Sequence, residues 1–136
     1  MGLDMYLERH VPREPVPDVD GAVVRENSDD YVEVAYWRKS NHIHNWFVNN
    51  IQGGVDNCER YPVARDKLQN LIDLCEFVIE HPDEAPSKLP TAAGFFFGST
   101  DYSDWYDDDN SDTVQQLEKV LREYPDDAEF YYHASW

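Results

Sequence analysis

The stretch that decides the fold is VAYWRKSNHIHNWF, residues 34–47, which holds two tryptophans, two histidines and two basic residues in one short run. At about 100° per residue its large apolar side chains gather within one half-turn, which predicts a helix over residues 34–51. The residues expected on the core face of that helix are Tyr36, Ser40, Ile43, Trp46 and Phe47. The asparagines and glycines of NNIQGG, residues 49–54, are typical of a helix end.

The opposite face of this expected helix is the first candidate site. Arg38, His42 and Asn45 follow one another at i, i+4 and i+7, and Lys39 lies beside them. An arginine can bind a phosphate or carboxylate through two hydrogen bonds, and histidine and asparagine can add others. In the plainer alternative, Arg38 pairs with one of the many carboxylates and the other two side chains are solvated. Trp37 lies on the flank, either in the core or as an exposed plate on which a base stacks.

The two histidines of this stretch do not have the spacing of a metal site. In a helix His42 and His44 diverge by about 200°, whereas helical zinc ligands are spaced i, i+4. No cysteine or glutamate near them completes a ligand set. We therefore expect neither a metal nor a cofactor.

Three further segments have the patterns of strands. Residues 2–10 alternate between apolar and polar side chains, and so does the tail EFYYHASW, residues 129–136. AGFFFGST, residues 93–100, is a short apolar run between glycines, which predicts a buried strand. A glycine followed by Ser99 and Thr100 can also present backbone N–H groups to an anion, although the spacing of a P-loop is absent.

Two more segments predict helices. An apolar stripe marks residues 63–81, and its members are Leu68, Leu71, Ile72, Cys75, Val78 and Ile79. A capping box of Asp112 and Gln115 predicts the start of another helix, which runs to about Tyr124. Cys58 falls in a loop. Because the N-terminus has no export signal pattern, both cysteines are expected as reduced thiols in the cytoplasm.

This order of elements predicts a single α+β domain over residues 1–136. The simplest packing is a small, mainly antiparallel sheet of N-terminal, central and C-terminal strands, with about three helices on one face. A proline- and acid-rich loop over about residues 11–30 is the expected mobile segment.

The charge of the chain excludes some partners. Eleven Lys and Arg against 28 Asp and Glu give a net charge of −17, which repels nucleic acid and anionic membranes. The acidity fits a solvated surface, a surface for a basic partner or, least of all, a divalent cation site. No apolar run reaches the length of a membrane span.

An acidic turn, DYSDWYDDDNSD, residues 101–112, is the second candidate site. No register in it supplies the ligands of an EF-hand loop. Aromatic anchors in an acidic field suit a basic protein partner, and the residues are Asp104, Trp105, Tyr106, Asp107, Asp108 and Asp109.

Five motifs give the chain a resemblance to a family of small bacteriophage and prophage proteins. They are MGLDMYL, EVAYWRKSNHIHNWFV, GVDNC, LPTAAGFFFGSTDYSDWY and a C-terminal SW. The resemblance covers most of the chain apart from the proline-rich loop. It implies an accessory protein of the infected or lysogenic host cell that acts on host defence, by blocking a nuclease complex, by imitating DNA or by sequestering a nucleotide signal.

These features lead us to expect binding of a small anionic, nucleotide-like ligand without turnover. The expected ligand-binding residues are Trp37, Arg38, Lys39, His42, Asn45, Ser99, Thr100 and Tyr102. The alternative is an acidic inhibitor that imitates nucleic acid and occupies the basic groove of a host defence protein. A nucleotide-cleaving enzyme, with Ser99 or Thr100 as nucleophile and His42 as base, is the second alternative. We expect no direct nucleic-acid binding, no membrane association and a cytoplasmic location, and a homo-oligomer is left open.

Overall fold

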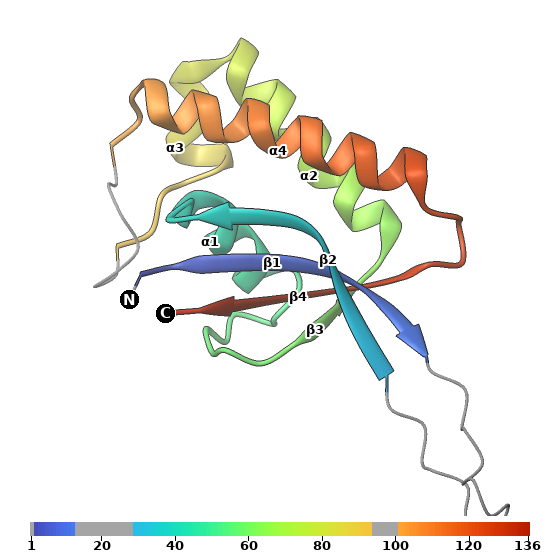
Figure 1. The fold of residues 1–136 in the computed structure, drawn as a ribbon. Coiled ribbons are helices and arrows are strands. Elements are labelled where there is room, and N and C mark those ends of the chain that lie inside the picture. Colours follow the sequence, from blue (N-terminus) through green and yellow to red (C-terminus); the bar gives the residue numbers. More distant parts are fainter. Residues whose placement is uncertain (1, 13–28, 94–100) are drawn as a thin grey trace, which may run out of the picture.

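The computed structural model describes residues 2–12, 29–93 and 101–136, which form one four-stranded antiparallel sheet with helices on one side of it (Figure 1). The strands are β1 (Asp4–Pro12), β2 (Asp29–Arg38), β3 (Tyr61–Val63) and β4 (Glu129–Ser135), in the order β2-β1-β4-β3. The helices are α1 (Asn41–Asn50), α2 (Arg65–Glu80), η1 (Pro82–Glu84), α3 (Ala85–Lys88) and α4 (Asp104–Glu123). The predicted α+β class is confirmed.

The two terminal strands lie where the alternation of their side chains predicts. In β1 and just before it, Leu3, Met5 and Leu7 are completely buried, and in β4 Tyr132 is completely buried beside them. The two strands pair antiparallel, with Asp4 opposite Ser135. Because alternate residues of a strand point to opposite faces, the other side chains of β1 and β4 lie on the face without helices.

The prediction of one helix over residues 34–51 is wrong in its first third. Residues up to Arg38 belong to β2, and the helix begins at Asn41. The segment YVEVAYW, residues 31–37, is rich in β-branched and aromatic residues, and it pairs with β1 so that Ala35 and Trp37 are buried. Tyr36 therefore lies on the other face, 37% exposed, and not in the core. Ile43, Phe47 and their neighbours do face the core as predicted.

The helix α4 begins at Asp104, eight residues before the predicted start at Asp112. The acidic residues that suggested a turn lie in its first turns, where carboxylates are favourable beside the positive end of the helix dipole. Asp112 is thus an internal residue that accepts a hydrogen bond from Gln116 Nε2 at 2.8 Å, and its capping box with Gln115 does not form. The helix α2 covers most of the predicted residues 63–81, with Cys75 buried in its stripe, but Val63 belongs to β3 and Ile79 is 37% exposed.

Two predicted segments fall mostly outside the described residues. These are the loop 11–30, of which residues 13–28 are not described, and the strand 93–100, of which residues 94–100 are not described. The ends of that loop are not loop, because residues 11–12 extend β1 and residues 29–30 begin β2.

The outer helices are joined to the sheet and to each other by polar contacts. Arg65, at the start of α2, donates hydrogen bonds to the carbonyl groups of Leu121, Tyr124 and Pro125 at 2.7, 3.3 and 3.1 Å. The last carbonyls of a helix have no partner within it, so this arginine satisfies the C-terminal end of α4.

Candidate ligand site

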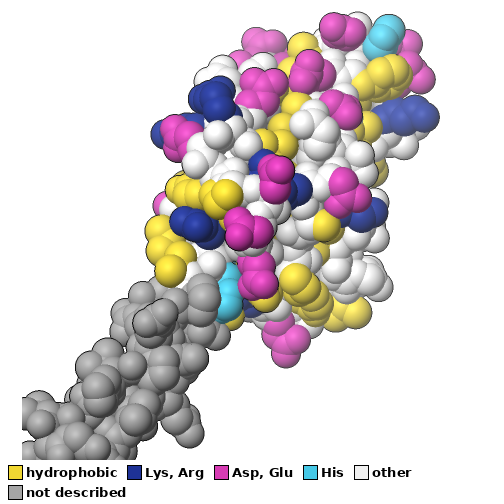
Figure 2. Space-filling model, turned by 90° about the vertical axis from the view of Figure 1, so that its right-hand side faces the viewer, with side chains coloured by type: hydrophobic (Ala, Val, Ile, Leu, Met, Phe, Trp, Pro, Cys, Tyr) yellow, Lys and Arg dark blue, Asp and Glu magenta, His cyan; other side chains and the backbone are white. Residues whose placement is uncertain are grey.

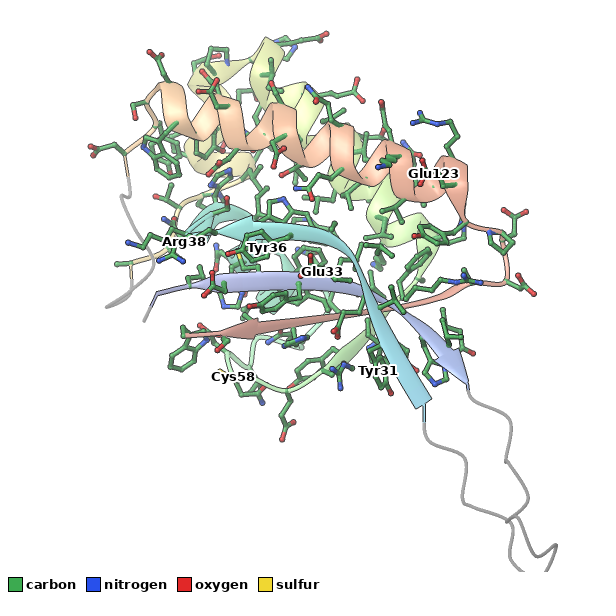
Figure 3. All side chains as sticks on the ribbon, in the orientation of Figure 1. Tyr31, Glu33, Tyr36, Arg38, Cys58 and Glu123 are labelled. Carbon is green, nitrogen blue, oxygen red and sulfur yellow. The ribbon has the colours of Figure 1, made fainter. Side chains whose placement is uncertain are left out.

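The face of the sheet without helices carries the candidate site. A β-bulge between Leu7 and Glu8 in the pairing of β1 with β2 leaves Val34 without an opposite residue. Because of this extra residue, the side chains that face the open side have odd numbers before the bulge and even numbers after it. Tyr31, Glu33, Tyr36 and Arg38 consequently follow one another along β2 (Figure 3). We call this surface the open face.

Two exposed cations converge at one end of the open face. A Cβ atom built on Gly2 would lie 3.4 Å from both Arg38 Nη2 and Lys39 Cε. The Arg38 side chain is 57% exposed, and its Nη1 lies 3.5 Å from Asp4 Oδ1, which is a long contact for an ion pair. The Arg38 guanidinium and the end of the Lys39 side chain thus lie beside one stretch of backbone, with Asp4 as the ion-pair partner of Arg38.

The backbone at Lys39 is in a left-handed conformation, with φ of 55°. A non-glycine residue pays roughly 1–2 kcal/mol for this region, and such residues persist only where their surroundings hold them. Here the Lys39 N–H donates a 2.7 Å hydrogen bond to the Leu3 carbonyl and closes the end of the sheet. Strained residues of this kind gather at functional sites, which supports the choice of this corner.

A row of three rings borders the cations. Tyr6 lies 5.5 Å from Tyr36 and 4.8 Å from His133, centroid to centroid, and the His133 ring is stacked on it. The Tyr36 hydroxyl donates to Asp4, and this hydrogen bond raises the Tyr36 pKa above its ordinary value. Burial raises the Tyr6 pKa in the same direction. Both phenols therefore stay neutral and offer flat surfaces for a ring.

Glu8 organises the middle of the open face. Its Oε1 accepts from Arg60 Nε at 2.9 Å and lies 3.2 Å from His133 Nε2. The Arg60 guanidinium in turn lies 3.8 Å from the centre of the Tyr31 ring. Glu8 also lies opposite Glu33 in the β1–β2 pair, so the Arg60 guanidinium offsets a repulsion between carboxylates.

Two of the expected ligand-binding residues are buried, which corrects the prediction for them. Trp37 is 2% exposed, and its Nε1 donates to Thr113 Oγ1 at 2.9 Å. His42 is completely buried against α4, with Nε2 2.9 Å from Asn110 Oδ1, and burial lowers its pKa to about 4. Because α1 begins at Asn41, the face that was expected to meet solvent packs on α4.

Asn45 and Tyr102 make their hydrogen bonds with residues other than the two cations. Asn45 is half-buried, and its Nδ2 donates to the Pro90 carbonyl at 3.3 Å. Tyr102 is 42% exposed, and its hydroxyl accepts from the Thr91 N–H at 3.1 Å. Ser99 and Thr100 lie outside the described residues. Of the set that the sequence proposes, the described structure brings only Arg38 and Lys39 together.

The acidic set on α4 divides between surface and interior. Asp104, Asp107 and Asp108 are exposed, and Trp105 is half-buried. Tyr106 is 1% exposed and donates to the Leu89 carbonyl at 2.6 Å, so it is no surface anchor. Asp109 accepts from Ser40 Oγ at 2.8 Å, and burial raises its pKa.

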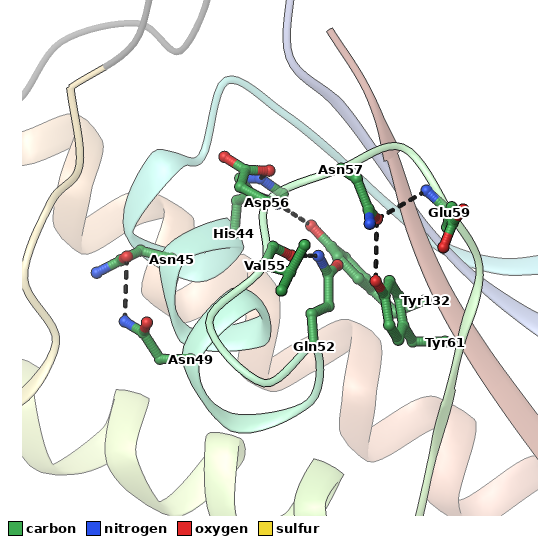
Figure 4. Close-up of polar contacts among 10 residues, drawn as sticks. All are labelled: His44, Asn45, Asn49, Gln52, Val55, Asp56, Asn57, Glu59, Tyr61 and Tyr132. Carbon is green, nitrogen blue, oxygen red and sulfur yellow. Dashed lines mark hydrogen bonds and ion pairs between the residues drawn. The ribbon is translucent and has the colours of Figure 1, made fainter.

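The structure also contains a buried hydrogen-bond chain that the sequence did not suggest. His44 Nε2 lies 2.8 Å from Asp56 Oδ1, and His44 Nδ1 lies 2.6 Å from the Tyr132 hydroxyl (Figure 4). Since a carboxylate only accepts, Nε2 carries the proton and Nδ1 accepts from the tyrosine. Burial lowers the His44 pKa, and Asp56 opposes that shift. Both nitrogens are occupied, so the histidine ties the loop after α1 to β4. Twelve residues separate the pair in sequence, and no spacing rule marks it.

A shallow hollow of about 650 Å³ lies elsewhere, between the start of α2 and the start of β4. Arg65 borders it, but both terminal nitrogens of this arginine already donate to the end of α4. The hollow therefore offers no free cation.

The remaining observations concern metal ions, membranes and similarity to known proteins. Within residues 2–12, 29–93 and 101–136, no group of three His, Cys, Asp or Glu side chains could hold a metal ion. In the same part of the chain no helix combines the length and apolar character needed to cross a membrane. No family model, no curated protein and no solved structure matches the chain.

Proposed function

We propose that this protein acts by binding and sequesters a small anionic, nucleotide-like ligand on the open face. The observation that supports this most strongly is the convergence of Arg38 and Lys39 at Gly2 in a chain of net charge −17. Two cations beside one another repel, and their placement is favourable when an anion lies between them. The resemblance to phage proteins suggests a nucleotide signal of host defence, captured in the cytoplasm of the host.

The geometry suggests how each part of such a ligand is held. A phosphate between the Arg38 guanidinium and the Lys39 ammonium replaces the long contact to Asp4 with short, charge-assisted hydrogen bonds. The base then lies over the Tyr36–Tyr6–His133 row, where stacking on an aromatic side chain contributes about 1–3 kcal/mol.

Binding without turnover is favoured over nucleotide cleavage by the state of the histidines in α1. His42 is completely buried against α4, and His44 has both nitrogens in hydrogen bonds inside the fold. A general base must reach the proton that it removes, directly or through one water molecule. Neither histidine can reach a ligand held by Arg38 and Lys39, because both side chains are buried inside the fold.

The test is calorimetric titration with mononucleotides, cyclic di- and trinucleotides and nucleotide sugars. We expect at least one to bind in the micromolar range, and Arg38→Ala and Lys39→Ala each to weaken it roughly tenfold or more. Arg122→Ala and Lys119→Ala are matched controls, because these cations are exposed on α4, away from the open face. Absence of binding across the panel, or equal losses in the controls, contradicts the proposal.

A second candidate is the acidic inhibitor, and the composition of α4 favours it. This helix carries seven carboxylates against two cations, and Asp104, Asp107 and Asp108 are exposed at its start. Figure 2 shows acidic side chains spread over one side of the molecule with basic ones between them, as on an ordinary solvated surface. Capture of a basic protein from host extract, lost at high salt and lost when these three residues become Asn, supports the inhibitor. Unchanged capture by that variant excludes this patch.

A further inference from the structure

We infer that the open face holds a second anion subsite at Arg60, so that the ligand is of dinucleotide size, with two phosphate groups and two bases. This inference rests on the proposed function and specifies the class of ligand for that site. Its basis is the way in which Arg60 is held.

Arg60 is fixed by two contacts that leave much of its guanidinium available. Its Nε donates to Glu8 Oε1 at 2.9 Å, and the Tyr31 ring lies 3.8 Å beneath the guanidinium carbon. The side chain remains 37% exposed. Within the described part of the chain, its two terminal amino groups have no hydrogen-bond partner. An arginine held in this way loses little freedom when those amino groups bind a phosphate.

The carboxylates that contact the two arginines lie on one strand. Asp4, which contacts Arg38, and Glu8, which holds Arg60, point to the same face of β1 four residues apart. Four residues of strand span about 13 Å. A single nucleotide offers one phosphate and one base and fills one end of this span, whereas a linked pair of nucleotides covers more of it.

Rings lie beside each arginine, and His133 of the first set also contacts Glu8, which holds Arg60. Arg38 lies beside the row of Tyr36, Tyr6 and His133. The set at Arg60 consists of Tyr31, His10 and Tyr131, in which Tyr31 is 5.2 Å from His10 and 5.4 Å from Tyr131. Successive bases of a flexible strand stack on aromatic side chains in this manner. The two arginines and the rings beside them therefore match two nucleotide units.

Charge compensation alone accounts for only part of this arrangement. Glu8 lies opposite Glu33, and a cation beside Glu8 offsets their repulsion. In offsetting this repulsion, Arg60 contacts Glu8 through Nε, and its two terminal amino groups take no part in that contact. The double variant Glu8→Gln/Arg60→Gln removes both the repulsion and the subsite, and Glu8→Gln alone is its control.

Titration with adenosine 5′-monophosphate and with the linear dinucleotide pApA separates the two proposals. We expect the wild-type protein to bind pApA roughly tenfold tighter than the mononucleotide, and the double variant to bind both about equally. The Glu8→Gln control should keep the tenfold difference. If the double variant also keeps that difference, or if the wild type binds both equally, the Arg60 subsite is wrong while the Arg38 site stands. If neither compound binds, the Arg60 subsite is wrong, and the nucleotide panel described above decides the Arg38 site.

Discussion

The side-chain amide of Gln116 pairs with the backbone of Tyr36 in both directions. Gln116 Oε1 accepts from the Tyr36 N–H, and Gln116 Nε2 donates to the Tyr36 carbonyl, each at 2.8 Å. A residue of α4 thus occupies the place of a neighbouring strand at the edge of β2. This protects an edge that would otherwise offer unpaired backbone groups, and it locks α4 onto the sheet.

We predict that Gln116→Ala lowers the free energy of unfolding by about 1–2 kcal/mol, since two hydrogen bonds are lost at a partly exposed position. Gln115→Ala is the matched control, because Gln115 is exposed on the same helix. Urea unfolding followed by circular dichroism measures both. Equal stabilities of the two variants would show that the amide pair contributes nothing.

Two substitutions of Lys39 distinguish its effect on stability from its effect on ligand binding. Lys39→Gly should raise the free energy of unfolding by about 0.5–1 kcal/mol over Lys39→Ala, because glycine adopts the left-handed φ of 55° without strain. Both variants lose the ammonium group and should lose ligand affinity to the same extent. A glycine variant that is no more stable than the alanine variant would show that the backbone there is unstrained.

Acid should destabilise the protein through His42. In the unfolded chain this histidine titrates near 6.5, and in the folded protein its pKa is about 4 because it is buried. Between these values the unfolded state binds a proton that the folded state does not bind. The contribution of His42 is therefore complete above pH 6.5 and is lost as the pH falls to about 4, with a total near 3 kcal/mol.

The measurement is urea unfolding of the wild type and of His42→Gln from pH 7 to pH 4. Other groups titrate in both proteins, so the difference between the two curves isolates the histidine. We expect the gap between them to change by about 3 kcal/mol across this range, in favour of the variant at low pH. Parallel curves would contradict the burial of a neutral His42.

The hydrogen bond between Tyr132 and His44 should contribute to stability as a buried pair. Tyr132→Phe removes the donor to Nδ1 at a completely buried position, and we expect a loss of about 1–3 kcal/mol. Tyr61→Phe is the matched control, because the Tyr61 hydroxyl donates to Asn57 at a partly buried site and should cost less. Nitrogen NMR shifts of His44 should show the proton on Nε2. A proton on Nδ1 instead would reverse the direction of the chain.

Several elements could be predicted because their signal is local. The alternation of Leu3, Met5 and Leu7 is enough to define β1, and a stripe at helical spacing is enough to define α2. The boundary inside residues 34–47 was missed because both halves contain aromatic residues that fit either period. Only the strand-forming composition of residues 31–37 could have indicated it.

The candidate site was predicted in part for the same reason. Arg38 and Lys39 were identified because cations are rare in this chain, and the structure places them together. The role of Arg60 could not be predicted, since it depends on β3 lying beside β4 and on contacts to Glu8 and Tyr31.

The sequence by itself determined which faces of β1, β4 and α2 are apolar, because periodicity within one element depends only on its own backbone geometry. The tertiary structure alone decided that residues 31–38 form a strand, that His42 is buried, and that Gly2, Arg38 and Arg60 share one face. The physical reason is that each of these depends on hydrogen bonds and packing between segments far apart in the chain. The free energy of these contacts exceeds the local conformational preference of each segment. The sequence of one segment does not show which distant segment it will contact.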